Sequence, residues 1–599
     1  MEPFALLHRD GADHAELLRG DVVTVATLAE IPLPDGSGPQ TLALIPYRQI
    51  SERGFACVDD DAPLECLRIT HHETLPLAEL IDSLPTGTAV RDGAFDLSDD
   101  EYEDVVTDVL RDEIGRGEGA NFVIHRVYRA TVDGDPLASA RAALRTLLTR
   151  ERGAYWTFLV HTGSRTLVGA TPERHVSVAD GLVMMNPISG TFRHDGTRTL
   201  ADFLTDRKEI EELHMVLDEE LKMMATVAEH GGQVVGPYLK RMTHLTHTEY
   251  LLAGRGSLDV REVLRETMFA PTVTGSPVEN ACRVIARHER RGRGYYAGVL
   301  ALLGHDDQGR QTLDAPILIR TAEISPEGAL RVPVGATLVR HSTPAGEVAE
   351  THAKAAGILS AFRSPSDRTA SVRPEHPDPL VEPALADRNT GLARFWLEQR
   401  RPGALTVPAL DGRTAVIVDA EDTFTAMLAH QLRALGLVVT VVPWTAPVPA
   451  ADLLILGPGP GDPGSSDAKM RRLRALVTEA LATARPLLGV CLGHQILSAE
   501  LGLRLHRRDS PYQGLARDVD LFGTSRRVGF YSSFTALTAA LPGVEIAADP
   551  DGSVHALRGP GFAGVQFHPE SVLSADGVAV LRELLPPLLE RVISPAISG

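Results

Sequence analysis

The chain has 599 residues, which is too long for a single hydrophobic core and predicts two or more domains. Its 43% hydrophobic and 23% charged residues are typical of a globular protein, and the formal net charge of −20 argues against a nucleic-acid-binding surface. The four cysteines lack metal-ligand spacing, which favours a reducing cytoplasm, and no basic leader or apolar run of about 18 residues predicts secretion or membrane insertion.

Residues 1–362 have the pattern of a large α+β domain. Apolar runs of strand length cover residues 122–128, 156–161 and 182–185, and longer helical patterns lie between them. Such a mixture of strands and long helices is typical of an α+β domain rather than of a regular βαβ repeat.

Two helical patterns in this region carry paired glutamates. Glu209 and Glu212 lie within residues 206–224, and Glu347 and Glu350 lie just before Lys354. A spacing of three places both members of each pair on one helix face. Solvated surface charge and an acidic functional site would both produce this pattern, and the spacing alone does not separate them.

The segment 363–412 predicts a linker between the domains. Residues 364–383 are rich in proline and charge and predict an extended chain, whereas residues 392–399 have the pattern of one short helix. After the linker, short buried strands over 415–419 and 438–442 enclose a helical pattern over 425–435. This alternation predicts a parallel, doubly wound α/β domain over residues 413–599.

A cysteine in this second domain has the surroundings of a nucleophile. Cys491 follows a buried strand over 486–490 and precedes a helix that begins near His494, so it lies on a strand-to-helix turn beside free helical N–H groups, which stabilise a thiolate. His568 and Glu570 follow later and provide a base with a carboxylate to orient it. The glycine-rich loop 457–463 lets backbone amides approach an oxyanion.

Residues 410–590, with the motifs at 457–463, 489–495 and 566–570, resemble a class I glutamine amidotransferase of the anthranilate synthase type. The resemblance implies that Cys491 attacks the side-chain amide of glutamine and releases ammonia, with His568 as acid and base and Glu570 as its partner. It also implies oxyanion and glutamine contacts from Gly459, Gly461, Leu492, Gln495, Ser533 and Phe534. A histidine that the family usually has before the serine is missing from the sequence 531–534.

Residues 40–362 are similar to the chorismate-utilising family, which implies an α+β domain built as a two-sheet sandwich around a site for chorismate and one Mg²⁺. Chorismate is a dicarboxylate, and a cluster of glutamates would repel it unless a hard cation lay between them. The resemblance rests on motifs at 44–49, 169–173, 186–191, 245–247, 272–277, 296–298 and 317–321.

The same resemblance implies roles for individual residues. Glu212 and Glu350 would hold Mg²⁺ directly, with Glu347 acting through water, and Glu209 would protonate the departing C4 hydroxyl. Arg320 and Tyr296 would bind the enolpyruvyl carboxylate, helped by Thr272 and by the backbone at Gly335, while Lys354 balances charge. The remaining active-site positions carried over from the family are His247, Ser189, Thr191, Thr274, Gly275 and Thr337.

Two positions indicate which nucleophile is used. Asn121 stands where water-adding branches of the family have a lysine base, and Ser189 stands where the para-aminating branch has a nucleophilic lysine. An amide does not deprotonate water near neutral pH, so ammonia added at C2 is expected to give 2-amino-2-desoxyisochorismate. Because ammonia must reach a distant site unprotonated, we expect an enclosed passage between the domains.

The reaction is expected to stop at 2-amino-2-desoxyisochorismate, without loss of pyruvate. Ser189 and Thr337 replace the alanine and glycine usual in anthranilate synthases and add bulk beside the substrate, and residues 6–9 lack the element that senses tryptophan. Together with residues 185–191, 513–514 and 520–523, this resembles the fused 2-amino-2-desoxyisochorismate synthases of phenazine biosynthesis. A fused anthranilate synthase and a non-catalytic amidotransferase relic remain as alternatives, and the family resemblance implies a homodimer.

Overall fold

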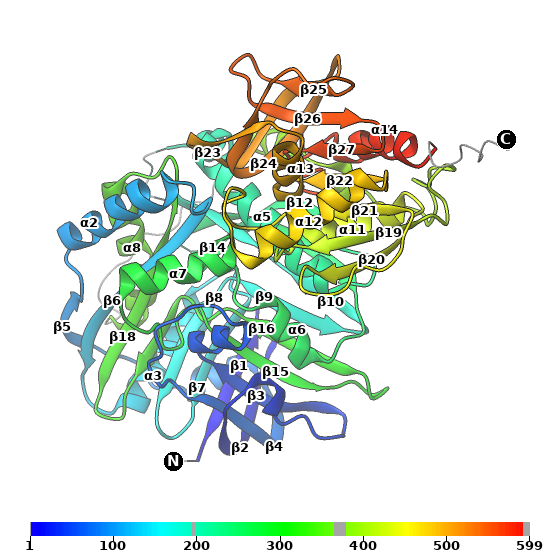
Figure 1. Ribbon diagram of the computed structural model, residues 1–599. Coiled ribbons are helices and arrows are strands. Elements are labelled where there is room, and N and C mark those ends of the chain that lie inside the picture. The colour runs from blue at the N-terminus through cyan, green and yellow to red at the C-terminus, as the bar shows by residue number, and fades with distance from the viewer. Residues whose placement is uncertain (1, 195, 197, 244, 364–378, 591–599) are drawn as a thin grey trace, which may run out of the picture.

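The computed structural model describes residues 2–194, 196, 198–243, 245–363 and 379–590. In Figure 1 the N-terminal part, in blue to green, lies below the C-terminal part, in yellow to red, and helix α5 (Arg207–Val227) lies where the two meet. Most of the predicted linker's proline-rich start, residues 364–378, lies outside the described residues.

The N-terminal part is built on an extensive antiparallel network of strands. The strands β1 to β18 are joined by hydrogen bonds into one network, because long strands such as β6 pair with neighbours from several regions of the chain. The mixed α/β character predicted for this part is confirmed, although the strands expected in two sheets are connected through shared ladders. These strands are β1 (Phe4–Arg9), β2 (His14–Val25), β3 (Gly38–Ile45), β4 (Leu64–Pro76), β5 (Val90–Phe95), β6 (Asn121–Val132), β7 (Trp156–His161), β8 (Thr166–Thr171), β9 (Arg174–Ala179), β10 (Leu182–Met185), β11 (Ile188–Arg193), β12 (Gln233–Arg241), β13 (Leu245–Arg255), β14 (Gly275–Ser276), β15 (Val299–His305), β16 (Gln311–Pro316), β17 (Thr321–Ile324) and β18 (Ala329–Val339).

Two helices of this part carry the paired glutamates. Glu209 and Glu212 lie in the first turns of α5, which Asp206 caps by accepting a hydrogen bond from the Lys208 amide at 2.8 Å. Glu347 and Glu350 lie on α8 (Pro344–Leu359). The other helices of this part are α1 (Leu77–Ser83), α2 (Asp99–Val109), α3 (Pro136–Arg150), α4 (Leu200–Thr205), α6 (Val260–Thr267) and α7 (Val278–Glu289).

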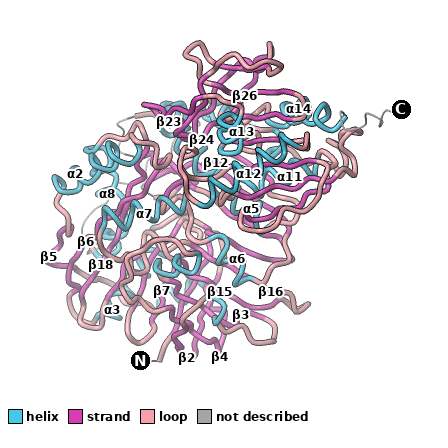
Figure 2. The backbone as a smooth tube through the Cα atoms, in the orientation of Figure 1, coloured by secondary structure: helices cyan, strands magenta, loops and turns pink. Residues whose placement is uncertain are grey.

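The C-terminal part is the predicted doubly wound α/β domain. Its main sheet has the order β20-β19-β21-β22-β27-β26-β25, in which the first five strands are parallel. Figure 2 shows helices α11, α12 and α13 lying among these strands. The elements of this part are β19 (Thr414–Asp419), α11 (Phe424–Ala434), β20 (Val438–Pro443), β21 (Leu453–Leu456), α12 (Ala468–Ala482), β22 (Leu487–Val490), α13 (Leu492–Glu500), β23 (Arg504–Leu521), β24 (Thr524–Leu537), β25 (Glu545–Ala548), β26 (Val554–Gly559), β27 (Phe562–Val565) and α14 (Gly577–Glu590).

The described residues of the predicted linker pack against both parts of the molecule. They form α9 (Val381–Asp387) and α10 (Arg394–Leu397), the second of which confirms the short helix expected there. Arg388 is buried and donates to the carbonyl oxygens of the N-terminal part, while the Trp396 indole donates to the Glu570 carbonyl at 2.8 Å. Buried aromatic and basic side chains therefore attach this segment to both parts of the molecule.

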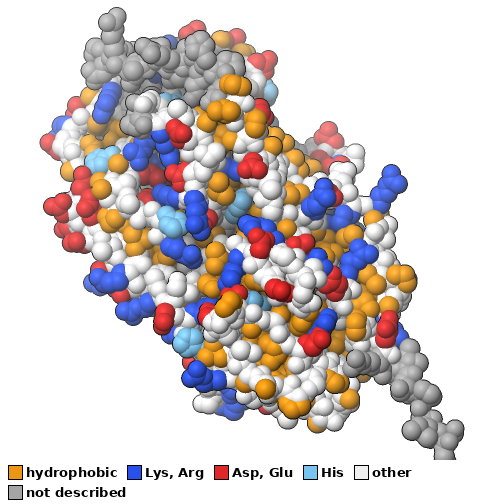
Figure 3. All heavy atoms as spheres, turned by 90° about the horizontal axis from the view of Figure 1, so that it is seen from above, with side chains coloured by type: hydrophobic (Ala, Val, Ile, Leu, Met, Phe, Trp, Pro, Cys, Tyr) orange, Lys and Arg blue, Asp and Glu red, His pale blue; other side chains and the backbone are white. Residues whose placement is uncertain are grey.

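The face of the molecule that Figure 3 shows carries charges of both signs. On the face shown in Figure 3, acidic, basic and apolar side chains are interspersed. Among the described residues, no helix combines the length and apolar character needed to cross a membrane.

Candidate functional site

Cys491 is held in a strained turn at the end of a central strand. Its backbone has φ 51° and ψ −102°, between the last residue of β22 and the first residue of α13. Such a conformation is unfavourable for a residue with a Cβ and is typical of functional positions. A hydrogen bond from the Cys491 amide to the Val565 carbonyl at 2.9 Å fixes the turn against β27. The turn leaves the thiol at the N-terminus of α13, as the sequence predicts.

A histidine and a glutamate lie beside this cysteine. His568 Nδ1 is 2.8 Å from Glu570 Oε1, and both side chains are fully buried. Burial alone lowers the pKa of His568, but the neighbouring Cys491 and Glu570 raise it well above its usual value. The arrangement stabilises the protonated imidazole of His568, which is the partner that a cysteine nucleophile requires.

The residues expected around glutamine lie at the same end of the sheet. A Cβ on Gly459 would lie 3.0 Å from the Leu492 side chain, which places the glycine loop against the first residue of α13. The Gln495 amide donates to the Phe534 carbonyl at 3.0 Å. Ser533 has a different contact from the one expected, because its hydroxyl donates to the Gly117 carbonyl of the N-terminal part at 3.2 Å. Gly461 has a φ of 123°, a conformation that side chains rarely adopt.

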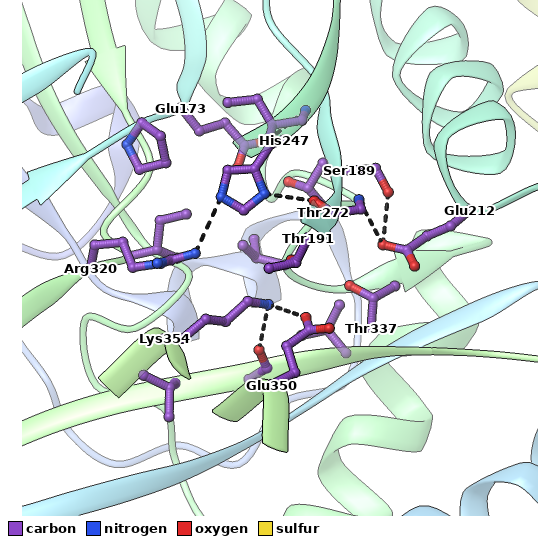
Figure 4. A pocket seen from close by; sticks show the side chains of 18 of the residues that line it. Glu173, Ser189, Thr191, Glu212, His247, Thr272, Arg320, Thr337, Glu350 and Lys354 are labelled. Carbon is purple, nitrogen blue, oxygen red and sulfur yellow. Dashed lines mark hydrogen bonds and ion pairs between the residues drawn. The ribbon is translucent and has the colours of Figure 1, made fainter. Parts of the chain in front are cut away.

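A separate pocket lies in the N-terminal part, and Figure 4 shows its lining. It brings together most of the residues predicted to bind a dicarboxylate, and basic groups at one end face carboxylates at the other. The predicted residues that line it are Ser189, Thr191, Glu212, His247, Thr272, Tyr296, Arg320, Gly335, Thr337, Glu350 and Lys354.

The basic end of this pocket consists of Arg320 and the groups around it. An Arg320 N–H lies 3.4 Å from His247 Nε2, and His247 Nδ1 lies 2.6 Å from the Gly190 carbonyl. Burial, followed by the charge of Arg320, lowers the pKa of His247 to about 3, so the ring is neutral and the positive charge stays on the guanidinium. Within the pocket, Arg320 is therefore the cation available to a substrate carboxylate.

The acidic end is formed by Glu212 of α5 and Glu350 of α8. Glu212 accepts hydrogen bonds from the Ser189 hydroxyl at 2.8 Å and from the Gly190 amide at 3.2 Å. Burial, opposed by Lys208 and reinforced by Glu209 and Glu350, raises the pKa of Glu212 to about 7.

Two lysines and an arginine partly neutralise these carboxylates. Lys208 Nζ lies 3.0 Å from Glu347, and Lys354 Nζ lies 2.6 Å from Glu350 and 2.8 Å from the Gly335 carbonyl. Although burial opposes it, the lysines lower the pKa of Glu350 to about 2. Glu209 pairs with Arg198 at 3.0 Å, and Glu209 and Glu347 line a cavity next to the pocket.

The predicted metal ligands fit a hard cation in chemistry but are not gathered as a ready coordination sphere. Over the described ranges, no group of three or more acidic, histidine or cysteine side chains lies close enough together to hold a metal ion. However, Glu209 Oε2 and Glu347 Oε2 are buried without hydrogen-bond partners among the described residues, and carboxylate oxygens are the ligands that Mg²⁺ prefers. Lys208 pairs with Glu347 and Lys354 pairs with Glu350, while the carboxylates keep the donor chemistry that the predicted Mg²⁺ requires.

Two predicted chorismate residues lie away from the pocket lining. The Thr274 hydroxyl donates to the Ala270 carbonyl at 2.8 Å, and Gly275 is paired with Phe122 in the ladder between β14 and β6. A Cβ on Gly275 would lie 2.3 Å from the Asn121 carbonyl, so this glycine is required by close approach of the two strands. Both residues therefore support the wall behind the pocket.

Glu173 was not selected from the sequence, but it lines the pocket beside Thr272. It is buried, and burial raises its pKa to about 8 despite hydrogen bonds that favour the carboxylate. The signal in the sequence was its place in the motif 169–173, where a glutamate follows Thr171 and Pro172 at the end of β8.

Replacing Glu173 by glutamine is expected to make the protein less sensitive to alkaline pH. Between pH 4.5 and about 8 the folded chain keeps a proton on Glu173 that the unfolded chain has released, so stability falls as the pH rises through this window. Glutamine cannot titrate, and the drop in melting temperature between pH 6 and pH 8.5 should shrink by a few degrees. The exposed variant Glu229→Gln is the control and should leave the drop unchanged. Equal drops in wild type and Glu173→Gln would contradict a buried, protonated Glu173.

The two sites are connected through the middle of α5. Asp218 is buried and accepts hydrogen bonds from the Tyr531 hydroxyl at 2.8 Å, from the Ser571 hydroxyl and from the Val572 amide at 2.9 Å. The Tyr531 carbonyl in turn faces the Cys491 thiol at 3.6 Å. One helix therefore carries pocket glutamates near its start and contacts the surroundings of the cysteine further along.

This geometry defines a two-part protein in which a cysteine amidotransferase fold is joined to a pocket for an anionic ligand, and the comparisons with known proteins name both parts. A family model for "chorismate binding enzyme" matches residues 56–360, and one for "Glutamine amidotransferase class-I" matches residues 416–586. The chain belongs to these families, as the sequence motifs predict.

Relatives with both parts are known in bacteria. A protein of Pseudomonas chlororaphis named "Anthranilate synthase, phenazine specific" is 49% identical and covers 98% of this chain and 94% of its own length. An anthranilate synthase of Azospirillum brasilense is 31% identical and covers 78% of this chain and 62% of its own length. Among solved structures, the menaquinone-specific isochorismate synthase of Escherichia coli has a TM-score of 0.51 at 18% identity, covering 60% of this chain and 89% of its own, which shows the fold of the N-terminal part.

Proposed function

We propose that this protein uses glutamine to aminate chorismate at C2, giving 2-amino-2-desoxyisochorismate for phenazine or related secondary metabolism. The observation that carries the proposal is that one chain combines the Cys491, His568 and Glu570 group with a pocket that has an arginine at one end and carboxylates at the other. The phenazine-specific name of the relatives at 49% identity supports the metabolic setting.

The amidotransferase half would release ammonia by acyl transfer. The Cys491 thiolate attacks the side-chain carbonyl of glutamine, and the backbone amides of Gly459 and Leu492 stabilise the oxyanion. His568 protonates the leaving nitrogen, so ammonia departs and a thioester remains. Water then attacks the thioester with His568 as base and Glu570 holding the ring, which yields glutamate and restores the thiol.

The chorismate half would exchange a hydroxyl for an amino group. Arg320 and Tyr296 bind the enolpyruvyl carboxylate at the basic end of the pocket, and Lys354 holds Glu350 in place. Ammonia forms a bond to C2, the ring double bond shifts, and the C4 hydroxyl leaves as water after Glu209 donates a proton to it. The added nitrogen then loses a proton, so that one ammonia enters and one water leaves.

Glu212 and Glu350 would hold Mg²⁺, with Glu347 acting through water. When bound, the ion would neutralise the carboxylates and attract the ring carboxylate of chorismate to the acidic end of the pocket. Ser189 donates a hydrogen bond to Glu212 and so positions one of these ligands in addition to filling space.

We further propose domain boundaries at 1–362, 363–412 and 413–599, a cytoplasmic homodimer, and glutamine contacts from Gly461, Gln495, Ser533 and Phe534. Thr191, Thr272 and His247 would contact chorismate, while Thr274 and Gly275 shape the wall behind it. A molecular mass near twice that of one chain in light scattering would support the dimer.

The product separates the proposal from its runner-up. A fused anthranilate synthase, which the names of the relatives favour, would also expel pyruvate and give anthranilate. Purified protein with chorismate, Mg²⁺ and glutamine labelled at the amide nitrogen is expected to give a labelled, aminated dihydro acid by mass spectrometry, without anthranilate fluorescence. Anthranilate that rises in proportion to enzyme would reject the proposal.

The double variant Ser189→Ala with Thr337→Gly is expected to release some pyruvate. Both side chains line the pocket, and their removal gives the enolpyruvyl group room to adopt the pose that elimination requires. Pyruvate is measured with lactate dehydrogenase alongside the aminated product, and the single variants are the controls. A double variant that still aminates but forms no pyruvate would show that these side chains are not the obstacle.

A further inference from the structure

Asn121, the first residue of β6, is buried with its side-chain amide unused. It has 0% exposure, and neither its Oδ1 nor its Nδ2 has a hydrogen-bond partner within the described part of the chain. Because an amide has strong donors and acceptors, burying it unpaired is costly and calls for a ligand or a functional reason.

The side chain lies on the face of β6 that leads to the chorismate pocket. Side chains alternate along a strand, so Asn121 shares a face with Val123, which lines the pocket, and with His125, whose ring stacks on Tyr296 at 5.0 Å. Phe122 and Ile124 point to the other face and pack in a separate apolar cluster with α2 and α7. Asn121 is therefore the residue that precedes the pocket-lining Val123 on the same face of β6.

The residues just before Asn121 reach the amidotransferase part. The Gly117 carbonyl accepts hydrogen bonds from Ser533 at 3.2 Å and from Gln513 at 2.9 Å. Ser533 lies two residues after Tyr531, whose carbonyl faces the Cys491 thiol. The short segment 117–123 thus runs from the neighbourhood of the cysteine to the chorismate pocket.

Asn121 has a polar neighbour on one side and apolar neighbours on the other. Its partner on β14 is Ser276, whose hydroxyl donates to the buried Glu219 at 2.6 Å. Ala120, Met215 and Val339 form a small buried cluster, and Val339 is the cross-strand partner of Asn121. Met215 also contacts the C-terminal part, since a Cβ on Gly514 would lie 2.6 Å from its Cγ. The apolar cluster on the β18 side favours a neutral amine over its charged form.

We propose that Asn121 is the relay point for ammonia between the two sites, a role that rests on the proposed function. Its Oδ1 accepts an N–H of ammonia while its Nδ2 donates to the nitrogen lone pair, so a neutral molecule is held without being protonated. The walls of Ala120, Met215 and Val339 keep the molecule from water. Asn121 acts on the delivery of ammonia rather than on chorismate, and it is a positioning residue.

The variant Asn121→Leu tests this role because it removes both polar groups. Glutamate release and aminated product are measured together, once with glutamine and once with ammonium chloride at pH 8.5 as the nitrogen source. We expect amination from glutamine to fall about tenfold, the factor that corresponds to one hydrogen bond, while amination from ammonium changes by less than about threefold. Glutamate formed per aminated product should rise from about one to above about five.

Two further variants make the result decisive. Asn121→Ser keeps a donor and an acceptor in a smaller side chain. It is expected to form more than half as much aminated product per glutamate as wild type, even if the leucine variant folds poorly. Ile124→Val, on the opposite face of β6, is the control and should behave as wild type. An equal loss with both nitrogen sources, or a ratio near one in Asn121→Leu, would overturn the relay role. A wild type that aminates with neither source would instead overturn the proposed function.

Discussion

The variant Cys491→Ser is expected to lose glutamine-driven amination by at least about three orders of magnitude while ammonium-driven amination remains near the wild-type rate. A serine hydroxyl is far less acidic than a thiol, so the charge pair that raises the pKa of His568 cannot form with the alcohol. Among the described residues, those that line the second pocket all belong to the N-terminal part, so this pocket should be unaffected. Glutamate release and aminated product are measured with each nitrogen source.

Cys57→Ser is the matched control, because Cys57 is a half-buried free cysteine in the N-terminal part. It should keep both activities. A Cys491→Ser protein that still hydrolyses glutamine would contradict the nucleophile assignment. Loss of amination from ammonium as well would mean that the cysteine is needed for the structure of the second pocket.

Glu209→Gln is expected to lose amination and to keep glutamine hydrolysis, the reverse of Cys491→Ser. Burial raises the pKa of Glu209 against the effect of Lys208 and Arg198, which shifts the group toward the protonated form that an acid needs. A carboxamide cannot transfer that proton to the departing hydroxyl, so amination should fall by about two to four orders of magnitude with either nitrogen source. Glutamine hydrolysis should continue, because the Cys491 site is unchanged. The two half-reactions are followed separately, by glutamate release and by mass spectrometry of the product.

Glu211→Gln is the control for this experiment. Glu211 lies on the same helix but pairs with Arg207 at 2.7 Å on the outer side, away from the pocket lining. It should retain amination within about threefold. If Glu211→Gln lost as much activity as Glu209→Gln, the effect would come from the charge of the helix rather than from proton donation.

Local patterns predict the amidotransferase half well. The strand-to-helix turn at Cys491, the strand predicted over 415–419 and the helix predicted over 425–435 lie within one residue of where periodicity places them. Each of these elements depends on contacts between residues close in the sequence, so a single sequence is enough to predict it. The glutamate pairs on α5 and α8 were likewise predicted on single helix faces.

Contacts between distant segments were not predictable in the same way. Lys208 neutralises Glu347 across 139 residues, and Asp218 accepts hydrogen bonds from residues more than 300 positions away. No local spacing encodes such partners, because they depend on how whole elements dock. The contacts of the segment after residue 379 were hidden for the same reason, since Trp396 and Arg388 are buried against distant parts of the chain.

Helix α5 has a consequence for the exchange of parts between related enzymes. Lys222 on this helix lies 4.4 Å from the ring of Phe424, which itself lies 4.4 Å from the ring of His568. A hybrid that joins the N-terminal part of one relative to the C-terminal part of another would therefore combine an α5 from one protein with a Phe424 and a His568 from the other. A functional hybrid would need to take α5 and the amidotransferase residues that contact it from the same relative. The two parts are therefore expected to be inherited together as one gene segment.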